Sequence, residues 1–295
     1  MATPTQNSTT VTYNLQISYD NKIDSLLLGM KWGGGLGSGV TLSYSFPVGT
    51  ASFDQTYGYN GNESEWNAGW YSLNTTEQLA FESALSTLSD VANISFVEFS
   101  DNATTVGEIR VAMSQLVDTE GAGSWAYAPG SYPSAGDVWL SPDLFLSNPI
   151  TVGSWQFSTL IHELGHAVGL SHPFSGNSSS GSSLPQGVNG TDNYFYTVMS
   201  YTADPSGNEY FIDREPETPM LLDIQALQYL YGENTSYNSG DTTYTFTGDG
   251  KYFETIWDGG GQDTIDYTDS TTGAFIDLRE GEWSSLGQPI VFTNG

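Results

Sequence analysis

All three histidines of this 295-residue chain lie in one short segment, at positions 162, 166 and 172. The segment reads His-Glu-Leu-Gly-His-Ala-Val-Gly-Leu-Ser-His. Imidazole is the commonest protein ligand of catalytic zinc. Because every histidine of the chain falls in this segment, we predict a metal site there, with His162, His166 and His172 as ligands.

The spacing of these residues suggests how they could share one metal ion. His162 and His166 are at positions i and i+4, so on a helix they lie on the same face. Gly169 can take a positive φ, which would end the helix and let His172 approach from another direction. Three nitrogen ligands leave a coordination position open for water, as in catalytic zinc sites. Glu163 can reach that water as a general base.

Ordinary core packing is the plainer explanation, and it must be weighed against zinc binding. The short pattern H-E-x-x-H can arise on any amphipathic helix, and this segment has an apolar face of the usual kind. The full pattern H-E-x-x-H-x-x-G-x-x-H is far more specific and is the signature of metzincin-type zinc peptidases. The resemblance to metzincins therefore favours zinc. The apolar face consists of Phe157, Leu160, Ile161, Leu164 and Val168.

A second motif lies downstream of the histidines. Residues 197–201 read Thr-Val-Met-Ser-Tyr, and a Met beside a Val is by itself ordinary core packing. After the zinc motif, this stretch resembles the methionine turn beneath the metal of metzincins, which implies a supporting role for Met199. The Met-Ser-Tyr form resembles the serralysin and astacin branches. Their resting enzymes use the tyrosine as an extra zinc ligand, so the resemblance implies that role for Tyr201.

The resemblance to serralysins continues towards the C-terminus. Residues 221–232 resemble the helix that closes their catalytic domain, and residues 239–244 and 255–266 resemble parts of their calcium-binding segment. A solvated turn is the plainer explanation for the aspartates, because Asp-Gly turns are common. The chain departs from serralysins in lacking the tandem calcium repeat G-G-x-G-x-D-x-U-x. The resemblance implies calcium ligands at Asn238, Gly240, Thr242, Asp258, Gly260, Gly261 and Asp263.

The composition of the chain limits its partners. Acidic residues number 34 and basic residues 6, which gives a formal net charge of -28. A surface this negative repels nucleic acid and anionic lipid, so we expect neither as a partner. Cysteine is absent, so core packing and bound metals must hold the fold. No run is long and apolar enough to span a membrane, and residues 1–8 lack the pattern of a signal peptide. The resemblance implies secretion by a serralysin-like route that needs no such peptide.

Apolar periodicity predicts the elements that must position these motifs. Helices are predicted from a cap at Thr75 or Thr76 to about Val91, over 155–168, and over 220–231 with Gly232 ending the last. The glycine-rich residues 33–37 lack a following G-K-[ST], so we expect a flexible connection rather than a phosphate-binding loop. Alternation predicts an extended arm over 10–20 and strands over 40–46, 94–99, 109–113, 124–128 and 137–140.

This order of elements is that of metzincins, so we expect an α+β fold. A catalytic domain over residues 1–235 would combine a twisted, mostly parallel sheet with the zinc helix. A partial all-β, β-roll-like calcium-binding segment would follow over 236–295. The strand at 124–128 is short and bounded by Gly and Pro, which indicates a sheet edge. Residues between Pro173 and Met199 would form the tip of the substrate pocket. An extended substrate would pair with Ser124, Trp125, Ala126 and Tyr127.

These features predict a secreted zinc endopeptidase that acts as a monomer on proteins or peptides. One catalytic zinc would activate water near neutral pH, and Glu163 would take the proton. Tyr201 would stabilise the oxyanion after moving off the metal, as the resemblance implies. Calcium would be structural. A different zinc hydrolase is one alternative, and the methionine turn with Tyr201 argues against it. A calcium-dependent binding or adhesion module with a vestigial zinc site is another, and the intact H-E-x-x-H argues against that.

Overall fold

The computed structural model describes residues 5–6, 9–49, 51–54, 65–174, 190–204, 211–268 and 270–293. The strands are β1 (Thr5–Gln6), β2 (Val11–Tyr13), β3 (Met30–Trp32), β4 (Val40–Ser45), β5 (Trp70–Tyr71), β6 (Ile94–Glu98), β7 (Thr105–Val106), β8 (Ile109–Ser114), β9 (Ser124–Ala126), β10 (Val138–Leu140), β11 (Phe211–Ile212), β12 (Thr243–Thr245), β13 (Thr264–Asp266) and β14 (Phe292–Thr293). The helices are α1 (Asn21–Asp24), α2 (Thr75–Val91), α3 (Gln115–Thr119), α4 (Pro142–Phe145), α5 (Trp155–Ala167) and α6 (Leu221–Tyr231).

The main sheet is mostly parallel, as the sequence predicts. Its strand order is β6-β4-β8-β10-β9, and β5 also pairs with β8. Strands β6, β4, β8 and β10 run parallel, whereas β9 pairs antiparallel with β10 at the end of the order. All six residues of β8 and all three of β10 are buried, as expected for parallel strands covered on both faces. The predicted edge strand is therefore confirmed as β9.

The cap of helix α2 lies one residue before the earlier of the two predicted cap positions. Asn74 has extended backbone angles, and its side chain accepts from the N–H groups of Thr76 and Glu77 at 2.9 and 3.1 Å. The Glu77 side chain accepts in return from the Asn74 N–H at 2.7 Å, which completes a capping box. Thr75 is the first helical residue, so the prediction of a threonine cap is wrong. The asparagine carbonyl oxygen occupies the place that a threonine hydroxyl would have taken.

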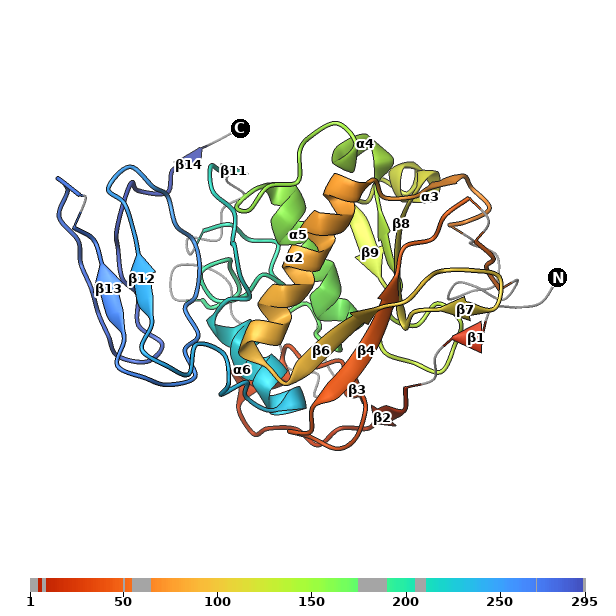
Figure 1. The fold of residues 1–295 in the computed structure, drawn as a ribbon, viewed down its shortest axis with the longest axis horizontal. Coiled ribbons are helices and arrows are strands. Elements are labelled where there is room, and N and C mark those ends of the chain that lie inside the picture. Colours follow the sequence, from red (N-terminus) through yellow and green to blue (C-terminus); the bar gives the residue numbers. More distant parts are fainter. Residues whose placement is uncertain are drawn as a thin grey trace.

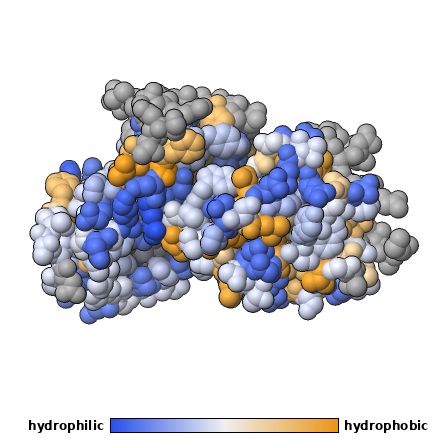
Figure 2. Space-filling model, turned by 90° about the horizontal axis from the view of Figure 1, so that it is seen from above, coloured by the Kyte–Doolittle hydropathy of each residue, from blue (hydrophilic) through white to orange (hydrophobic). Residues whose placement is uncertain are grey.

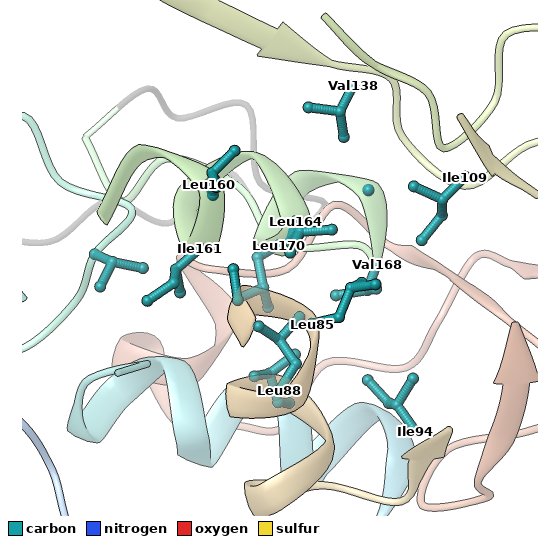
Figure 3. Close-up of a cluster of buried hydrophobic side chains, with 14 of the residues drawn as sticks. Leu85, Leu88, Ile94, Ile109, Val138, Leu160, Ile161, Leu164, Val168 and Leu170 are labelled. Atoms are coloured by element: carbon teal, nitrogen blue, oxygen red, sulfur yellow. The ribbon is translucent and has the colours of Figure 1, made fainter. Parts of the chain in front are cut away.

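Helix α5 packs its apolar face against α2. Ser154 caps it by accepting from the Phe157 N–H at 3.2 Å. Leu160 and Leu164 of α5 are fully buried and belong to the same cluster as Leu85 and Leu88 of α2. In Figure 3, Leu85 and Leu88 lie on the side of α5 where Leu170 is drawn, whereas Leu160 points to the opposite side, towards Val138. The core of the molecule thus lies directly beneath the helix that carries two of the histidines.

The N-terminal region is less regular than the sequence suggests. Only residues 11–13 of the expected arm over 10–20 form a strand, which pairs with β3. Asn14 and Tyr19 have positive φ angles of 53° and 67°, and such angles end an extended run.

Within the main core, α6 starts after Met220 and ends at Gly232, whose φ is 83°, in agreement with the predicted helix.

The glycine-rich loop after β3 encloses a buried cation. Nζ of Lys31 donates to the carbonyl oxygens of Gly34, Gly35 and Ser38 at 3.0, 3.4 and 3.1 Å. The same atom lies 4.6 Å from the centre of the Tyr231 ring. Burial lowers the pKa of Lys31 to about 8. The run is therefore a loop fixed by an ammonium group, and the prediction of a flexible connection is wrong.

The C-terminal strands lie at the end of the molecule opposite the N-terminus (Figure 1). Strands β12 and β13 pair in parallel there, and β14 returns to pair antiparallel with β11. Phe253 is buried in the main core, and it exchanges backbone and side-chain hydrogen bonds with Glu217 at 2.9 Å. The Trp257 indole donates to the Asn234 carbonyl at 2.9 Å. The boundary between residues 235 and 236 stays a prediction.

The surface shows no broad apolar face in the direction of Figure 2. Apolar residues appear there in separate small areas among hydrophilic ones. None of the helices in the described ranges has the length and apolar character needed to cross a bilayer.

Candidate metal centre

Helix α5 and the turn that follows it bring the three histidines together. Nε2 of His172 lies 3.1 Å from Nε2 of His162 and 2.9 Å from Nε2 of His166. Gly169 makes this possible with a φ of 110°, because a Cβ there would lie 2.4 Å from the Met30 carbonyl oxygen. The sequence prediction of a positive φ at this glycine is confirmed.

The turn is also held by neighbouring chain. The Leu28 N–H donates to the Gly169 carbonyl at 3.0 Å, and the Ser171 N–H donates to the Leu26 carbonyl at 2.9 Å. The indole N–H of Trp32 donates to the Ala167 carbonyl at 2.8 Å. These bonds satisfy carbonyls at the C-terminal end of α5 and fix the path of the chain towards the third histidine.

Main-chain carbonyls orient the first two imidazoles. Nδ1 of His162 donates to the Val198 carbonyl at 2.7 Å, and Nδ1 of His166 donates to the Leu170 carbonyl at 2.8 Å. Each bond leaves the Nε2 lone pair facing the other rings. Burial lowers the pKa of all three histidines. The pKa of His162 falls well below its usual value, that of His166 falls to about 4, and that of His172 falls to about 3. The three rings are therefore neutral at pH 7.

The donor set fits zinc. Ligands of a tetrahedral zinc at about 2.0 Å lie about 3.3 Å from one another, close to the distances between these nitrogens. Neutral nitrogen lone pairs at such distances repel, and a shared cation removes the repulsion. Within the described residues, these histidines are the group of potential metal ligands that lies close enough to hold one ion.

Glu163 lies beside the histidines with its two oxygens in different environments. The side chain is 4% exposed. Its Oε1 accepts from the Ser124 hydroxyl at 2.6 Å, whereas its buried Oε2 has no hydrogen-bond partner in the described part of the chain. Burial raises the pKa of Glu163 to about 7, although the bond from Ser124 opposes the rise. Such a carboxyl group can both take and return a proton near neutral pH.

The methionine turn supports the helix from below. Met199 is fully buried, and a Cβ on Gly165 would lie 2.6 Å from its sulfur atom. The turn is held by the carboxylate of Asp223, which accepts from the Thr197 hydroxyl at 2.5 Å and from the Val198 N–H at 2.8 Å. The Val198 carbonyl in turn accepts from His162. Asp223 on α6 thus orients a histidine through one peptide unit.

Tyr201 completes the group of rings. Its hydroxyl lies 3.0 Å from Nε2 of His172, although the side chain is 62% exposed. Its ring lies between those of His162 and Phe174, at centroid distances of 5.7 and 4.9 Å. Phe174 also stacks on His172 at 5.1 Å. The hydroxyl is thus within reach of the point where the imidazole nitrogens meet.

A cavity of about 410 Å³ opens beside this group. The start of β9 and the first turns of α5 form two of its walls, and the methionine turn forms another. Trp155 packs against the edge strand so closely that a Cβ on Gly123 would lie 2.7 Å from its ring. Apart from Glu163 and His162, the described residues that line the cavity carry no acidic or basic side chain; they include Trp155, Ser158, Thr159, Tyr194 and Ser200. Of the predicted pocket tip between Pro173 and Met199, residues 175–189 lie outside the described residues, whereas Tyr194 and Val198 line the cavity.

Comparisons with known proteins assign the family. The family model described as "Metallo-peptidase family M12", of the reprolysin type, matches residues 39–212. The serralysin of Proteus mirabilis is 30% identical over 278 residues, which are 85% of this chain and 54% of that protein. Serralysin C of Dickeya chrysanthemi is 31% identical over 75% of this chain and 49% of its own length. Metallopeptidase AprA of Pseudomonas marginalis is 30% identical over 81% and 55%.

The chain belongs to the serralysin-type metzincins, a family of metallopeptidases. It spans about half the length of the curated relatives that it matches, between 49% and 55% in the three cases above.

The edge strand of this metallopeptidase presents its side chains to two different partners. Ser124 donates to Glu163, whereas the Trp125 indole donates to Glu65 at 3.0 Å. The Tyr127 hydroxyl also donates to Glu65, which is 1% exposed. The side chains of the predicted substrate-binding strand are thus engaged within the protein, and their role towards a substrate stays a prediction.

The residues predicted to bind calcium lie on neighbouring turns of the metallopeptidase. The Thr242 N–H donates to Oδ1 of Asp263 at 2.9 Å, and a Cβ on Gly261 would lie 2.5 Å from the Gly240 carbonyl oxygen. Asp258 accepts from the Tyr244 hydroxyl at 2.5 Å and from the Gly260 N–H at 2.8 Å. Asn238 has a φ of 46° and donates to the Tyr244 hydroxyl. The structure brings these turns together, and calcium binding stays a prediction.

Four residues of the site carry no signal that the sequence argument used. They are Ser124 as a partner of Glu163, Asp223 beneath the methionine turn, and Trp155 and Phe174 as rings around the metal site. Asp223 occupies the N3 position of α6 and accepts from the Met220 N–H at 2.9 Å. An acidic residue at N3 is a helix-start signal, but it does not reveal a second partner elsewhere in the chain.

Proposed function

We propose that this chain is the catalytic part of a zinc-dependent endopeptidase that cleaves proteins or peptides outside the cell. One observation carries the proposal: three neutral imidazole nitrogens meet beside a buried carboxylate at the wall of a cavity. The membership of the serralysin-type metzincins supports the same reaction. The acidic composition supports a monomer that does not bind nucleic acid.

His162, His166 and His172 would hold the zinc ion, and the Tyr201 hydroxyl would be a further ligand in the resting enzyme. When bound, zinc supplies Lewis-acid chemistry that polarises the scissile carbonyl and makes water nucleophilic near neutral pH. The Val198 and Leu170 carbonyls keep two of the imidazoles in the tautomer that this requires.

Glu163 and Tyr201 would move and stabilise the charges of the reaction. As the water oxygen attacks the carbonyl carbon, Glu163 takes a proton from the water. It then gives a proton to the leaving amine nitrogen as the C–N bond breaks. The Tyr201 hydroxyl would donate to the oxygen that becomes negative, which its exposed position next to His172 allows.

The edge strand and the cavity would bind the substrate. The outer edge of β9 would offer N–H and C=O groups of residues 124–126 to an extended peptide, whereas the N–H and C=O of Tyr127 bond to Asp137 and Gly136. A side chain next to the scissile bond would enter the cavity, where Trp155 and Tyr194 supply aromatic walls. The volume of about 410 Å³ and the absence of lysine and arginine among the described lining residues favour a large uncharged side chain.

Calcium would complete the C-terminal turns. Carboxylates of Asp258 and Asp263, with carbonyls of Asn238, Gly240, Thr242, Gly260 and Gly261, are the oxygen ligands that calcium prefers. The close approach of Gly261 to Gly240 supports this grouping. A partial β-roll-like segment over 236–295 would then be held by an ion in addition to the contact of Phe253 with the main core.

The experiment that tests this function is casein digestion by the purified chain, with and without a zinc chelator. We expect digestion that stops on chelation and returns on addition of zinc, and about one zinc per chain. A protein with full zinc that leaves casein and mixed peptides uncleaved would contradict the peptidase proposal. Adhesion to a ligand that depends on calcium and is unaffected by Glu163→Gln would instead favour the binding module.

A further inference from the structure

The hydroxyl of Ser124 makes the one hydrogen bond that the described residues offer to the Glu163 carboxylate. The distance from Oγ to Oε1 is 2.6 Å, and both side chains line the cavity. A bond to a carboxylate of this length is charge-assisted and stronger than one between neutral groups. Ser124 therefore fixes where one oxygen of the carboxylate lies.

The edge strand fixes the direction of the serine in turn. Antiparallel pairing places Ser124 opposite Leu140, and the Ser141 N–H donates to the Gly123 carbonyl at 3.0 Å. Successive side chains of a strand point to opposite faces. Because the Trp125 indole donates to Glu65 on one face, the Ser124 hydroxyl must lie on the other face, towards Glu163.

The two oxygens of Glu163 are left unequal by this contact. Oε1 is occupied by the hydroxyl, whereas Oε2 is buried and has no hydrogen-bond partner within the described ranges. A buried oxygen without a partner is costly, so its place must be maintained by the surrounding structure. Without the bond from Ser124, the Glu163 carboxylate could rotate, and either oxygen could accept from another donor. Glu163 is 4% exposed, so such a donor would have to come from the protein or the cavity.

We propose that Ser124 is a positioning residue, which holds Glu163 by Oε1 so that Oε2 stays available for the proton of the attacking water. This rests on the proposed peptidase function. Ser124 belongs to the strand that would pair with the substrate. The same strand would therefore fix the position of the bound peptide and the orientation of the Glu163 carboxylate. A shift of the strand would therefore change the orientation of the base together with the position of the scissile bond.

The test compares Ser124→Ala, which removes the hydroxyl, with Ser124→Thr, which keeps it on a residue suited to a strand. The zinc-loaded full chain is assayed on an internally quenched peptide. For Ser124→Ala we expect kcat to fall about 10- to 100-fold, with KM, zinc content and melting temperature nearly unchanged. Ser124→Thr should recover most of kcat. Ser124→Ala with an unchanged kcat would overturn the proposal.

A double-mutant cycle separates positioning of Glu163 from any other role of the serine. In a Glu163→Gln background, Ser124→Ala should cause little further loss of kcat. An equal loss in both backgrounds would show that the serine acts without Glu163, and would overturn the proposal.

The cycle is also run on binding of a peptide hydroxamate by calorimetry, because the hydroxamate hydroxyl donates to the same carboxylate. This arm needs no turnover. If the wild-type chain hydrolyses nothing, the peptidase proposal fails, and the coupling measured in hydroxamate binding still decides whether Ser124 positions Glu163.

Discussion

The histidine site and the turns proposed to bind calcium are built in opposite ways. The histidines are held from outside: carbonyls of Val198 and Leu170 fix two rings, and the core lies beneath. In the C-terminal turns, by contrast, the proposed ligands Asp258 and Asp263 themselves stabilise the neighbouring backbone. Asp263 is exposed, and both aspartates accept from backbone N–H groups of the turns themselves.

This difference separates what each metal is expected to do. Main-chain carbonyls and the core support the histidine site, so loss of zinc should remove chemistry and leave the fold. The C-terminal turns have few buried apolar side chains, so an ion there would contribute to local order. Substitutions in the two places should therefore differ in which measurement they change.

The largest effect is expected at a zinc ligand. His166→Ala removes one imidazole and the bond to the Leu170 carbonyl, so the open site can no longer be completed. We expect loss of both zinc and peptide hydrolysis, while circular dichroism and the C-terminal protease-sensitivity pattern stay as in the wild type. Elemental analysis and a peptide assay measure this. Full zinc together with full activity would show that the ligand assignment is wrong.

Removing the general base should act on the rate alone. Glu163→Gln keeps the size of the side chain and loses the group that takes the proton, so kcat should fall by about 10² to 10⁴. Zinc content and melting temperature should stay near those of the wild type. A nearly normal rate at unchanged zinc content would exclude Glu163 from proton transfer.

Tyr201→Phe should have a smaller effect on the same site. The ring keeps its contacts with His162 and Phe174, and only the hydroxyl near His172 is lost. If that hydroxyl stabilises the oxyanion, kcat should fall about 10²-fold with little change in KM. Steady-state kinetics on one peptide measure both constants. A change confined to KM would assign the hydroxyl to substrate binding.

Calcium should give the smallest effect, and it should be seen in stability. By mass action, calcium at roughly 100 times its dissociation constant adds about 2.7 kcal/mol to the free energy of unfolding. We expect a higher melting temperature and slower limited proteolysis of residues 236–295 in millimolar than in micromolar calcium. Zinc content should not change between the two conditions.

A pair of variants tests the assignment within the turns. Asp263→Asn should weaken the response to calcium, whereas Asp241→Asn should keep it. Asp241 accepts from the Gln262 N–H on the same turns but is not among the proposed ligands. Identical melting curves of the wild type at both calcium concentrations would rule out the calcium site and leave the comparison resting on zinc.

The parts of the site that follow from short sequence patterns were predictable. The three histidines, the positive φ at Gly169 and the end of α6 at Gly232 depend on neighbouring residues. Strand β9 was recognisable as an edge because its flanking Gly and Pro residues are local signals. The parallel sheet followed from the resemblance to metzincins, which supplied the topology that periodicity alone does not.

Contacts between distant residues could not be predicted in the same way. Ser124 and Glu163 are separated by 39 positions, and Val198 and Asp223 by 25. Nothing in the residues around Lys31 reveals that three carbonyls and a tyrosine ring would enclose its ammonium group. Such pairs depend on how elements pack, and a single sequence records only the composition of each element.

The contact between Gly165 and Met199 also has a consequence for folding during synthesis, because the two residues belong to different parts of the chain. The zinc helix leaves the ribosome before Met199, and Asp223, which secures the turn around Met199, follows later still. A nascent chain that ends before α6 has all its histidines but lacks the support beneath them. We therefore expect peptidase activity to arise only when α6 has folded.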